Sequence, residues 1–270
     1  MTGALFSFSA MAIAGRELSS QLATAQIVFF RSAVGLVLLT LFFGATGWHR
    51  IHTRRIAAHV LRNLVHFAAQ YGWFVGVALL PLAQVFAIEF TVPLWVLLLA
   101  RLFLGERLSA ARVLAMLLGL VGVLLILRPG LQSVQPASLV VLASAFGFAI
   151  STLFVKRLVA TESATAIVFY MSFLQAPMGL VLALADWRTP NPALWPWLLV
   201  VGLSALTAHF SLSRALAEAD AMVVAPMDFL RLPLIAAVGA LFYAEPFDPM
   251  VIAGGAVMVV GNLLNLRARR

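Results

Sequence analysis

The chain has 270 residues, of which 63% are hydrophobic and only 10% are charged. A soluble domain is nearer half apolar and a quarter charged, so this composition excludes a soluble globular fold and makes lipid the solvent for much of the surface. The formal charge of +8 comes mostly from short loops, which indicates membrane topology and lipid headgroups as its partners, with no nucleic acid. The absence of cysteine excludes disulfides, thiol catalysis and cysteine-bound metals.

Ten apolar segments are candidates for membrane-spanning helices, each of which needs about 20 mostly apolar residues. In chain order they are residues 3–15, 24–46, 57–79, 82–104, 110–127, 137–155, 164–185, 194–216, 221–243 and 247–266. The first segment is short. We therefore expect it either to tilt in a thinned bilayer or to begin upstream of this sequence.

The distribution of basic residues between alternate loops predicts the orientation. With the N-terminus in the cytoplasm, thirteen basic residues lie on the cytoplasmic side: Arg50, Arg54, Arg55, Arg62, Arg101, Arg107, Arg112, Lys156, Arg157, Arg214, Arg267, Arg269 and Arg270. Three lie on the opposite side: Arg16, Arg128 and Arg188. The positive-inside rule therefore predicts a multi-pass protein of the inner (plasma) membrane with both termini in the cytoplasm.

The two halves of the chain repeat each other at a spacing of about 140 residues. The stretch IVFFRS at 27–32 returns as IVFYMS at 167–172. Five further positions return 139 residues later: Glu89 as Asp228, Glu106 as Glu245, Gly122 as Gly261, Arg128 as Arg267 and Gln70 as His209. Five spans per half is an odd number, so the second half enters the membrane upside down. The sequence predicts two inverted repeats, 1–130 and 131–270, an organisation typical of transporters whose substrate site lies between the halves.

Charged residues inside the membrane are costly and usually mark a pair, a cavity or a pathway. Arg31 and Glu89 each lie seven residues into a span that starts from the outer side, at a depth of about 10 Å. We expect them to pair directly, or through water or substrate. Asp228 and Arg231 are three residues apart and so share one helix face. They are either a self-neutralising ion pair or, for Arg231, a donor to a substrate carboxylate or phosphate.

A polar stripe on the third span consists of Asn63, His66 and Gln70. With His209 on the eighth span, it predicts either hydrogen bonds between helices or the wall of a cavity. The aromatic residues Trp73, Phe74, Tyr71, Trp95 and Tyr170 are expected to lie near the polar groups of the spans. They either face that cavity or pack against lipid and other helices.

No catalytic or cofactor motif is present. The sequence contains no phosphate-binding glycine loop, no HExxH and no nucleophile elbow, and the five histidines lack metal-ligand spacing. We therefore expect no enzymatic activity, no cofactor and no bound metal.

Two long segments resemble the EamA-type members of the drug/metabolite transporter superfamily. They are ALLPLAQVFAIEFTVPLWVLLLARLFLGERLSAARVLAMLLGLVGVLLI and ADAMVVAPMDFLRLPLIAAVGALFYAEPFDPMVIAGGAVMVVGNLL. The shared features are a proline in the fourth and ninth spans, the pairs Gly105–Glu106 and Ala244–Glu245 at their ends, and small residues in the fifth and tenth spans. The resemblance implies an all-α membrane protein of ten helices in two inverted repeats, with a cavity lined by spans 1, 3, 4, 6, 8 and 9. Such proteins move amino acids, nucleotide-derived compounds, vitamins and other metabolites, usually as exporters or exchangers.

We therefore expect a secondary transporter of a small polar or amphipathic metabolite, such as an amino acid, that works by alternating access. The predicted substrate-binding residues are Glu89, His66, Gln70, Trp73, His209, Arg231 and Tyr170, with Arg31 and Asp228 as charge partners or coupling groups. Glu106 and Glu245, at helix ends, are expected to be structural. A non-transporting scaffold or sensor, and an importer of a vitamin or nucleotide-like compound, are the alternatives. A monomer and a homodimer are equally compatible with the sequence.

Overall fold

The computed structural model describes residues 1–80, 82–127, 135–232, 234–235 and 249–267. Glu245, Arg128 and Pro233 lie outside the described residues. The described part is helical, without strands, which confirms the all-α class. Its α-helices are α1 (Thr2–Ser19), α2 (Thr24–Thr46), α3 (Ile56–Leu79), α4 (Leu82–Glu89), α5 (Val92–Phe103), α6 (Ala110–Leu127), α7 (Pro136–Leu158), α8 (Ala164–Ala183), α9 (Trp195–Glu218), α10 (Ala221–Val224) and α12 (Pro249–Arg267). Short 3₁₀ turns are η1 (Trp48–Ile51), η2 (Leu184–Asp186), η3 (Pro192–Leu194) and η4 (Ala225–Leu230).

Four stretches of the described chain are helical, long and apolar enough to cross a bilayer. They are Thr24–Thr46, Pro136–Leu158, Ala164–Asp186 and Pro192–Glu218. Shorter apolar helices cover Val92–Phe103, Ala110–Gly122, Ala221–Leu230 and Ile252–Leu264. These elements follow the predicted segments closely in position, and the chain is a multi-pass membrane protein.

The first helix is longer than the predicted segment 3–15, because it continues through Arg16 to Ser19. The Arg16 side chain is partly buried. Its Nη1 donates to the carbonyl oxygens of Val77 (2.6 Å) and Leu80 (3.3 Å), at the C-terminal end of α3. Arg16 can therefore lie inside the helix, because the carbonyl oxygens at the end of α3 accept hydrogen bonds from its guanidinium.

Proline interrupts the fourth predicted segment, 82–104, which is not one continuous helix. α4 ends at Glu89, a turn follows at Phe90 and Thr91, and α5 begins at Val92. Pro93 has no N–H for the Glu89 carbonyl and disfavours helical geometry in the residue before it, so the break falls at this position. The ninth segment has a corresponding irregularity, where η4 with Pro226 follows α10. Pro177, by contrast, lies within the uninterrupted α8.

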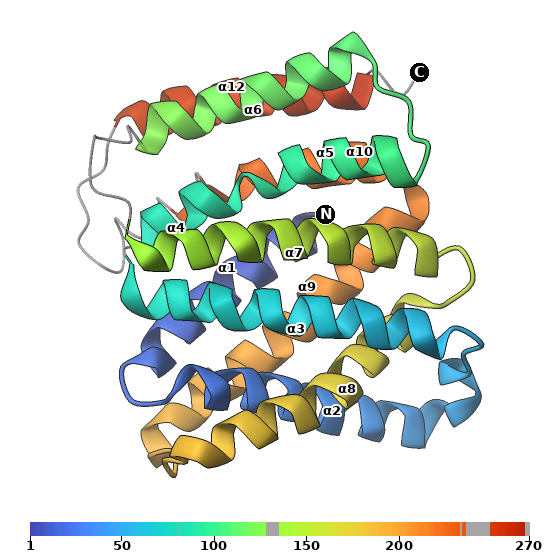
Figure 1. The fold of residues 1–270 in the computed structure, drawn as a ribbon, viewed down its shortest axis with the longest axis vertical. Helices are drawn as coiled ribbons and strands as arrows, with labels where there is room; N and C mark the ends of the chain where they lie inside the picture. Colours follow the sequence, from blue (N-terminus) through green and yellow to red (C-terminus); the bar gives the residue numbers. More distant parts are fainter. Residues whose placement is uncertain (81, 128–134, 233, 236–248, 268–270) are drawn as a thin grey trace.

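Helices from the two halves pack against each other in pairs. α1 packs on α9, α3 on α7, α2 on α8 and α6 on α12. Figure 1 shows α6 and α12 side by side at one edge of the bundle and α2 with α8 at the opposite edge. At the α6–α12 contact, a Cβ on Gly122 would lie 2.7 Å from the Gly254 carbonyl oxygen. Glycine is needed there because only a residue without a side chain lets the two backbones approach so closely.

Hydrogen bonds between loops and helix ends divide the loops into two groups. At one end of the bundle, Arg157 Nη2 donates to the Phe103 carbonyl and Arg112 pairs with Asp220. At the other end, the Gln26 amide at the start of α2 donates to the Arg188 carbonyl after α8. The regions after α5, α7 and α9 thus meet at one end, and those after α1 and α8 meet at the other. This is the arrangement expected of helices that cross the molecule in alternating directions.

Candidate functional site

A cavity of about 90 Å³ lies where helices of both halves meet. Its polar and charged lining comes from α3, the end of α4, α7, α9 and the segment from η4 to Arg231, while α1 and α5 add apolar side chains. These elements correspond to spans 1, 3, 4, 6, 8 and 9, the set that the family resemblance implies. The charged lining residues are Arg62, Glu89, Asp228 and Arg231, so two guanidiniums face the same space as two carboxylates.

Arg231 is the centre of a buried ion-pair network that joins the two halves. Its Nη2 donates to Glu89 Oε1 at 2.7 Å and to Asp228 Oδ2 at 2.9 Å. The predicted Asp228–Arg231 pair thus forms, but it is not self-contained, because Glu89 from α4 shares the same guanidinium nitrogen. Asp228 Oδ1 and Arg231 Nε have no hydrogen-bond partner, although both atoms are buried. Unpartnered charged atoms beside a cavity are available to a ligand.

Aromatic rings surround the Arg231 guanidinium. Its central carbon lies 5.4 Å from the ring centroid of Phe8, 5.1 Å from that of Phe86 and 5.8 Å from that of Phe90. Cation–π contacts of this kind stabilise a guanidinium that has left water, and they hold it in a fixed position. The rings come from α1, α4 and the turn after α4, so three segments fix the position of this one cation.

Trp73 contacts the same network from α3. Its indole N–H donates to Glu89 Oε2 at 2.7 Å, so each Glu89 oxygen accepts one hydrogen bond. Trp73 also lines the cavity and is 1% exposed. The break in the helix at Glu89 places this carboxylate between α3 and the η4 region.

The predicted polar stripe of α3 lies along the cavity wall. His66 and Gln70 line the cavity, and His209 of α9 faces them. The rings of His66 and His209 meet edge to face, with centroids 4.8 Å apart. His66 Nε2, His209 Nε2 and Gln70 Nε2 are all buried without a hydrogen-bond partner.

Arg31 lies behind this wall and does not pair with Glu89. Its Nη1 donates to Gln175 Oε1 at 3.2 Å and to Ser32 Oγ at 3.4 Å, and its Nη2 contacts the Met171 sulfur. The direct form of the predicted Arg31–Glu89 pair is therefore wrong. Equal depth in the membrane does not imply proximity, because Arg31 faces α8 whereas Glu89 faces Arg231.

Gln175, which the sequence analysis did not single out, connects Arg31 to the cavity. Its Nε2 donates to Asn63 Oδ1 at 2.8 Å and lies 3.0 Å from His66 Nδ1. It is fully buried in the middle of α8. A glutamine at that depth in an apolar helix is the signal that would have identified it.

Arg62 is the second functional candidate that the sequence analysis missed, because it was counted among the cytoplasmic loop cations. The structure places it within α3, 2% exposed and on the cavity wall. Its position six residues after the start of α3 was the available signal, since a membrane helix that long buries its second turn.

Tyr170 does not line the cavity. Its hydroxyl donates to the Ile51 carbonyl at 3.0 Å, and its ring lies 4.5 Å from the ring of His59. The expectation that it belongs to the same site as His66 and Arg231 does not match this geometry, because its face of α8 is directed toward η1 and the start of α3.

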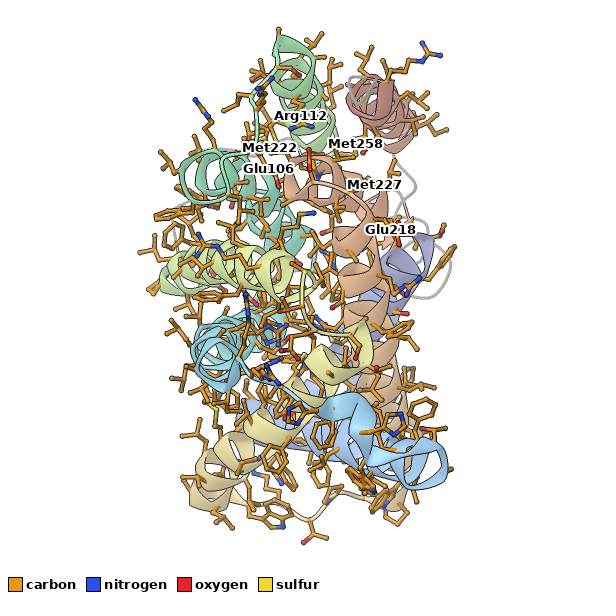
Figure 2. All side chains as sticks on the ribbon, turned by 90° about the vertical axis from the view of Figure 1, so that its right-hand side faces the viewer. Glu106, Arg112, Glu218, Met222, Met227 and Met258 are labelled. Carbon is orange, nitrogen blue, oxygen red and sulfur yellow. The ribbon has the colours of Figure 1, made fainter. Side chains whose placement is uncertain are left out.

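Glu106 has the structural position expected of it. Its two carboxylate oxygens accept hydrogen bonds from the backbone N–H groups of Ala221 (2.8 Å) and Met222 (2.9 Å), so it caps the start of α10. Arg112 contacts the same region through Asp220 and the Met222 sulfur, and Figure 2 shows Glu106, Arg112 and Met222 together. Acceptors at a helix N-terminus stabilise it, so this cluster fixes the segment that carries Asp228 and Arg231.

Curated proteins of similar sequence are named as transporters. The chain is 29% identical over 256 residues to an S-adenosylmethionine uptake transporter of Rickettsia bellii, covering 95% of this chain and 88% of the relative. It is 30% identical to the pseudopaline exporter CntI of Pseudomonas aeruginosa, covering 99% and 94%, and 30% identical to a riboflavin transporter of Vibrio cholerae, covering 87% and 80%.

One solved crystal structure superposes on the whole chain with a TM-score of 0.83, at 17% identity and covering 96% of that protein. At this identity the likeness concerns the fold alone. The model of the EamA-like transporter family matches residues 1–128 and again residues 135–267, which together take in every lining residue of the cavity. The chain therefore belongs to the EamA-like transporter family of the drug/metabolite transporter superfamily.

Proposed function

We propose that this protein is a secondary transporter that moves a small polar or amphipathic metabolite, an amino acid or a related compound, across the inner membrane by alternating access. The observation that carries the proposal is the cavity itself. It lies between helices of both halves, and its lining combines charged groups with buried polar atoms, among them His66 Nε2 and Gln70 Nε2, that have no hydrogen-bond partner. Groups of this kind at membrane depth mark a substrate pathway.

The volume of the cavity supports a moving mechanism. Ligand pockets usually measure about 300–1,000 Å³, whereas this one is about 90 Å³. A metabolite enters only if the helices around it separate. We infer that the structure is a closed form, and that the halves 1–130 and 131–270 rock about the Glu89–Arg231–Asp228 network.

A pair of similar contacts supports the inverted repeat. Arg16, near the end of α1, donates to the last carbonyls of α3 at Val77 and Leu80. Lys156, near the end of α7, donates to the carbonyls of Leu216 and Ala219 at the end of α9, both at 2.8 Å. The acceptors are separated by the repeat spacing of 139 residues. In the proposed repeat, α7 and α9 thus reproduce α1 and α3.

The substrate-binding residues in this proposal are Glu89, His66, Gln70, Trp73, His209 and Arg231, with Asp228 as their charge partner. The mixed charges favour a zwitterion over a simple cation. An importer of a vitamin or nucleotide-like compound is the second candidate, since relatives are named for uptake of S-adenosylmethionine and for transport of riboflavin.

The test is metabolite profiling of cells that express the wild type, Glu89→Gln or Asp228→Asn at matched membrane levels. Asp186→Asn is the control, because Asp186 pairs with Arg188 on the exposed surface and does not line the cavity. We expect at least one compound to change its ratio between cells and medium with the wild type and the control only. S-adenosylmethionine and riboflavin are the first compounds to quantify.

The compound so found is then loaded into proteoliposomes. Saturable uptake that increases when the same compound is present on the opposite side supports a transporter, whereas linear flux indicates a channel. A folded protein that gives no compound-specific change in cells and no flux for any compound in proteoliposomes contradicts the proposal and favours a scaffold or sensor.

A further inference from the structure

Arg62 is a buried cation without a carboxylate partner in the described part of the chain. Its Nη1 donates to the neutral Asn63 Oδ1 at 2.8 Å, and its Nε has no hydrogen-bond partner. The other cavity guanidinium, Arg231, has two carboxylates. An unpaired charge in a low-dielectric interior is strongly destabilising, and a charged residue at membrane depth usually marks a binding site or a pathway.

The groups next to Arg62 along the cavity are hydrogen-bond donors. Arg31 can only donate, so the Gln175 atom that it contacts is the amide oxygen, and the Gln175 Nε2 is directed toward His66 Nδ1. Since Nδ1 accepts that hydrogen bond, the proton of the neutral imidazole is on Nε2. His66 Nε2 is buried and unpartnered on the cavity wall, and Gln70 Nε2 is the next such donor along α3.

The opposite end of the cavity presents acceptors. Trp73, eleven residues beyond Arg62 on α3, bonds Glu89, and Asp228 has an unpartnered carboxylate oxygen. Eleven residues of helix rise by about 16 Å. The Arg62–His66 end and the carboxylate end therefore lie at different levels along α3, with Gln70 between them.

We propose that Arg62, with His66 Nε2 beside it, forms an anion-binding subsite, and that the ligand is an elongated zwitterion whose anionic group binds there while its cationic group binds at Asp228 and Glu89. The inference rests on the proposed transport function and narrows its substrate class. A simple α-amino acid carries both charges on one carbon and cannot reach both ends. The charged side chains of the lining, two guanidiniums and two carboxylates, sum to zero and suit a ligand without net charge.

The test uses four probes on the purified full chain in detergent: 6-aminohexanoate, hexanoate, hexylamine and glycine. Binding is measured as the concentration-dependent rise in Tm. We expect 6-aminohexanoate to bind the wild type at least about tenfold more tightly than glycine. Arg62→Gln should weaken 6-aminohexanoate and hexanoate by about tenfold or more and leave hexylamine unchanged, because a charge-assisted hydrogen bond is lost at one end only.

Asp228→Asn should have the reverse effect, weakening hexylamine and 6-aminohexanoate but not hexanoate. Arg54→Gln, at an exposed arginine in the loop before α3, is the matched control and should behave as the wild type. The proposal is overturned if Arg62→Gln weakens the acid and the amine equally, if glycine binds as tightly as 6-aminohexanoate, or if no probe raises the Tm of the wild type.

Flux in proteoliposomes separates this inference from the proposed function. A wild type that transports a metabolite saturably but does not distinguish the four probes keeps its function and loses the anion subsite. If the wild type distinguishes the probes through Arg62 and Asp228 but transports nothing, the anion subsite is supported and the transport function is contradicted.

Discussion

At the scale of single residues, the Arg231 guanidinium neutralises the carboxylates of Glu89 and Asp228 and so contributes to the stability of the fold. Arg231→Met leaves Glu89 and Asp228 close together without a counter-charge, so we expect a loss of about 3–5 kcal/mol in unfolding free energy. Arg231→Lys should lose less, because one ammonium can still donate to both carboxylates although it forfeits the three ring contacts. Thermal unfolding in detergent measures both variants.

The double variant Arg231→Met with Glu89→Gln checks this explanation. Removing one carboxylate removes much of the unpaired charge, so the double variant should be more stable than Arg231→Met alone. Additive losses would mean that the network contributes through packing instead of charge.

Arg31 acts on the cavity through the orientation of Gln175. With Arg31→Lys the amide oxygen still faces a donor, and His66 keeps its proton on Nε2. With Arg31→Leu the amide oxygen loses its donor and only the contact with Asn63 Oδ1 still orients Gln175, so we expect a minor population of the second His66 tautomer to appear. The ¹⁵N shifts of the imidazole distinguish the two tautomers. Identical spectra for both variants would remove this positioning role from Arg31.

Residue spacing predicted some of these contacts and missed others. The Asp228–Arg231 pair follows from the i, i+3 rule, and the His66–Gln70 stripe follows from helical periodicity. Depth alone cannot tell which face of a helix a residue occupies, so Arg31 was matched to Glu89 when its partner is Gln175. Arg62 was missed because it was counted with the cytoplasmic loop cations, although it lies inside the predicted segment 57–79.

At the scale of helices, basic side chains near helix ends connect neighbouring helices. Lys156→Met removes both donors to the Leu216 and Ala219 carbonyls at the end of α9. We expect this variant to lose about 1–2 kcal/mol in unfolding free energy, because those carbonyls then lack a protein donor. Arg214→Met, at an exposed position of α9, should change the Tm by much less. Equal losses in the two variants would exclude a specific role for Lys156.

Helix positions were predictable from the sequence to within a few residues, apart from the ends and breaks that depend on such contacts. Hydropathy gave α2 at its observed bounds, 24–46. Hydropathy ended the first segment at residue 15, because Arg16 is charged. In the fold, the Arg16 guanidinium instead donates a hydrogen bond to a carbonyl oxygen at the end of α3. Hydropathy also joined α4 to α5, because an apolar average does not show that Pro93 lacks the backbone N–H that a continuous helix needs at that position.

At the scale of the whole molecule, the arrangement of the loops and the distribution of charge point to the same topology. The repeat spacing predicted that a polar cavity would lie between the halves, and the cavity is lined from both. Its small volume was not predictable, since the sequence carries no information on how closely the helices around the cavity pack. Which end of the bundle faces the cytoplasm also depends on the charge rule and not on packing.

Single cysteines in this cysteine-free chain test the orientation directly. Ser20, between α1 and α2, and Thr161, between α7 and α8, are both exposed and lie in loops that the charge distribution assigns to opposite sides of the membrane. A membrane-impermeant maleimide added to intact spheroplasts should label Ser20→Cys, and should label Thr161→Cys only after the membrane is opened. The reverse pattern would invert the proposed orientation. Labelling of both from outside would contradict the five predicted crossings between them, because an odd number of crossings places the two loops on opposite sides of the membrane.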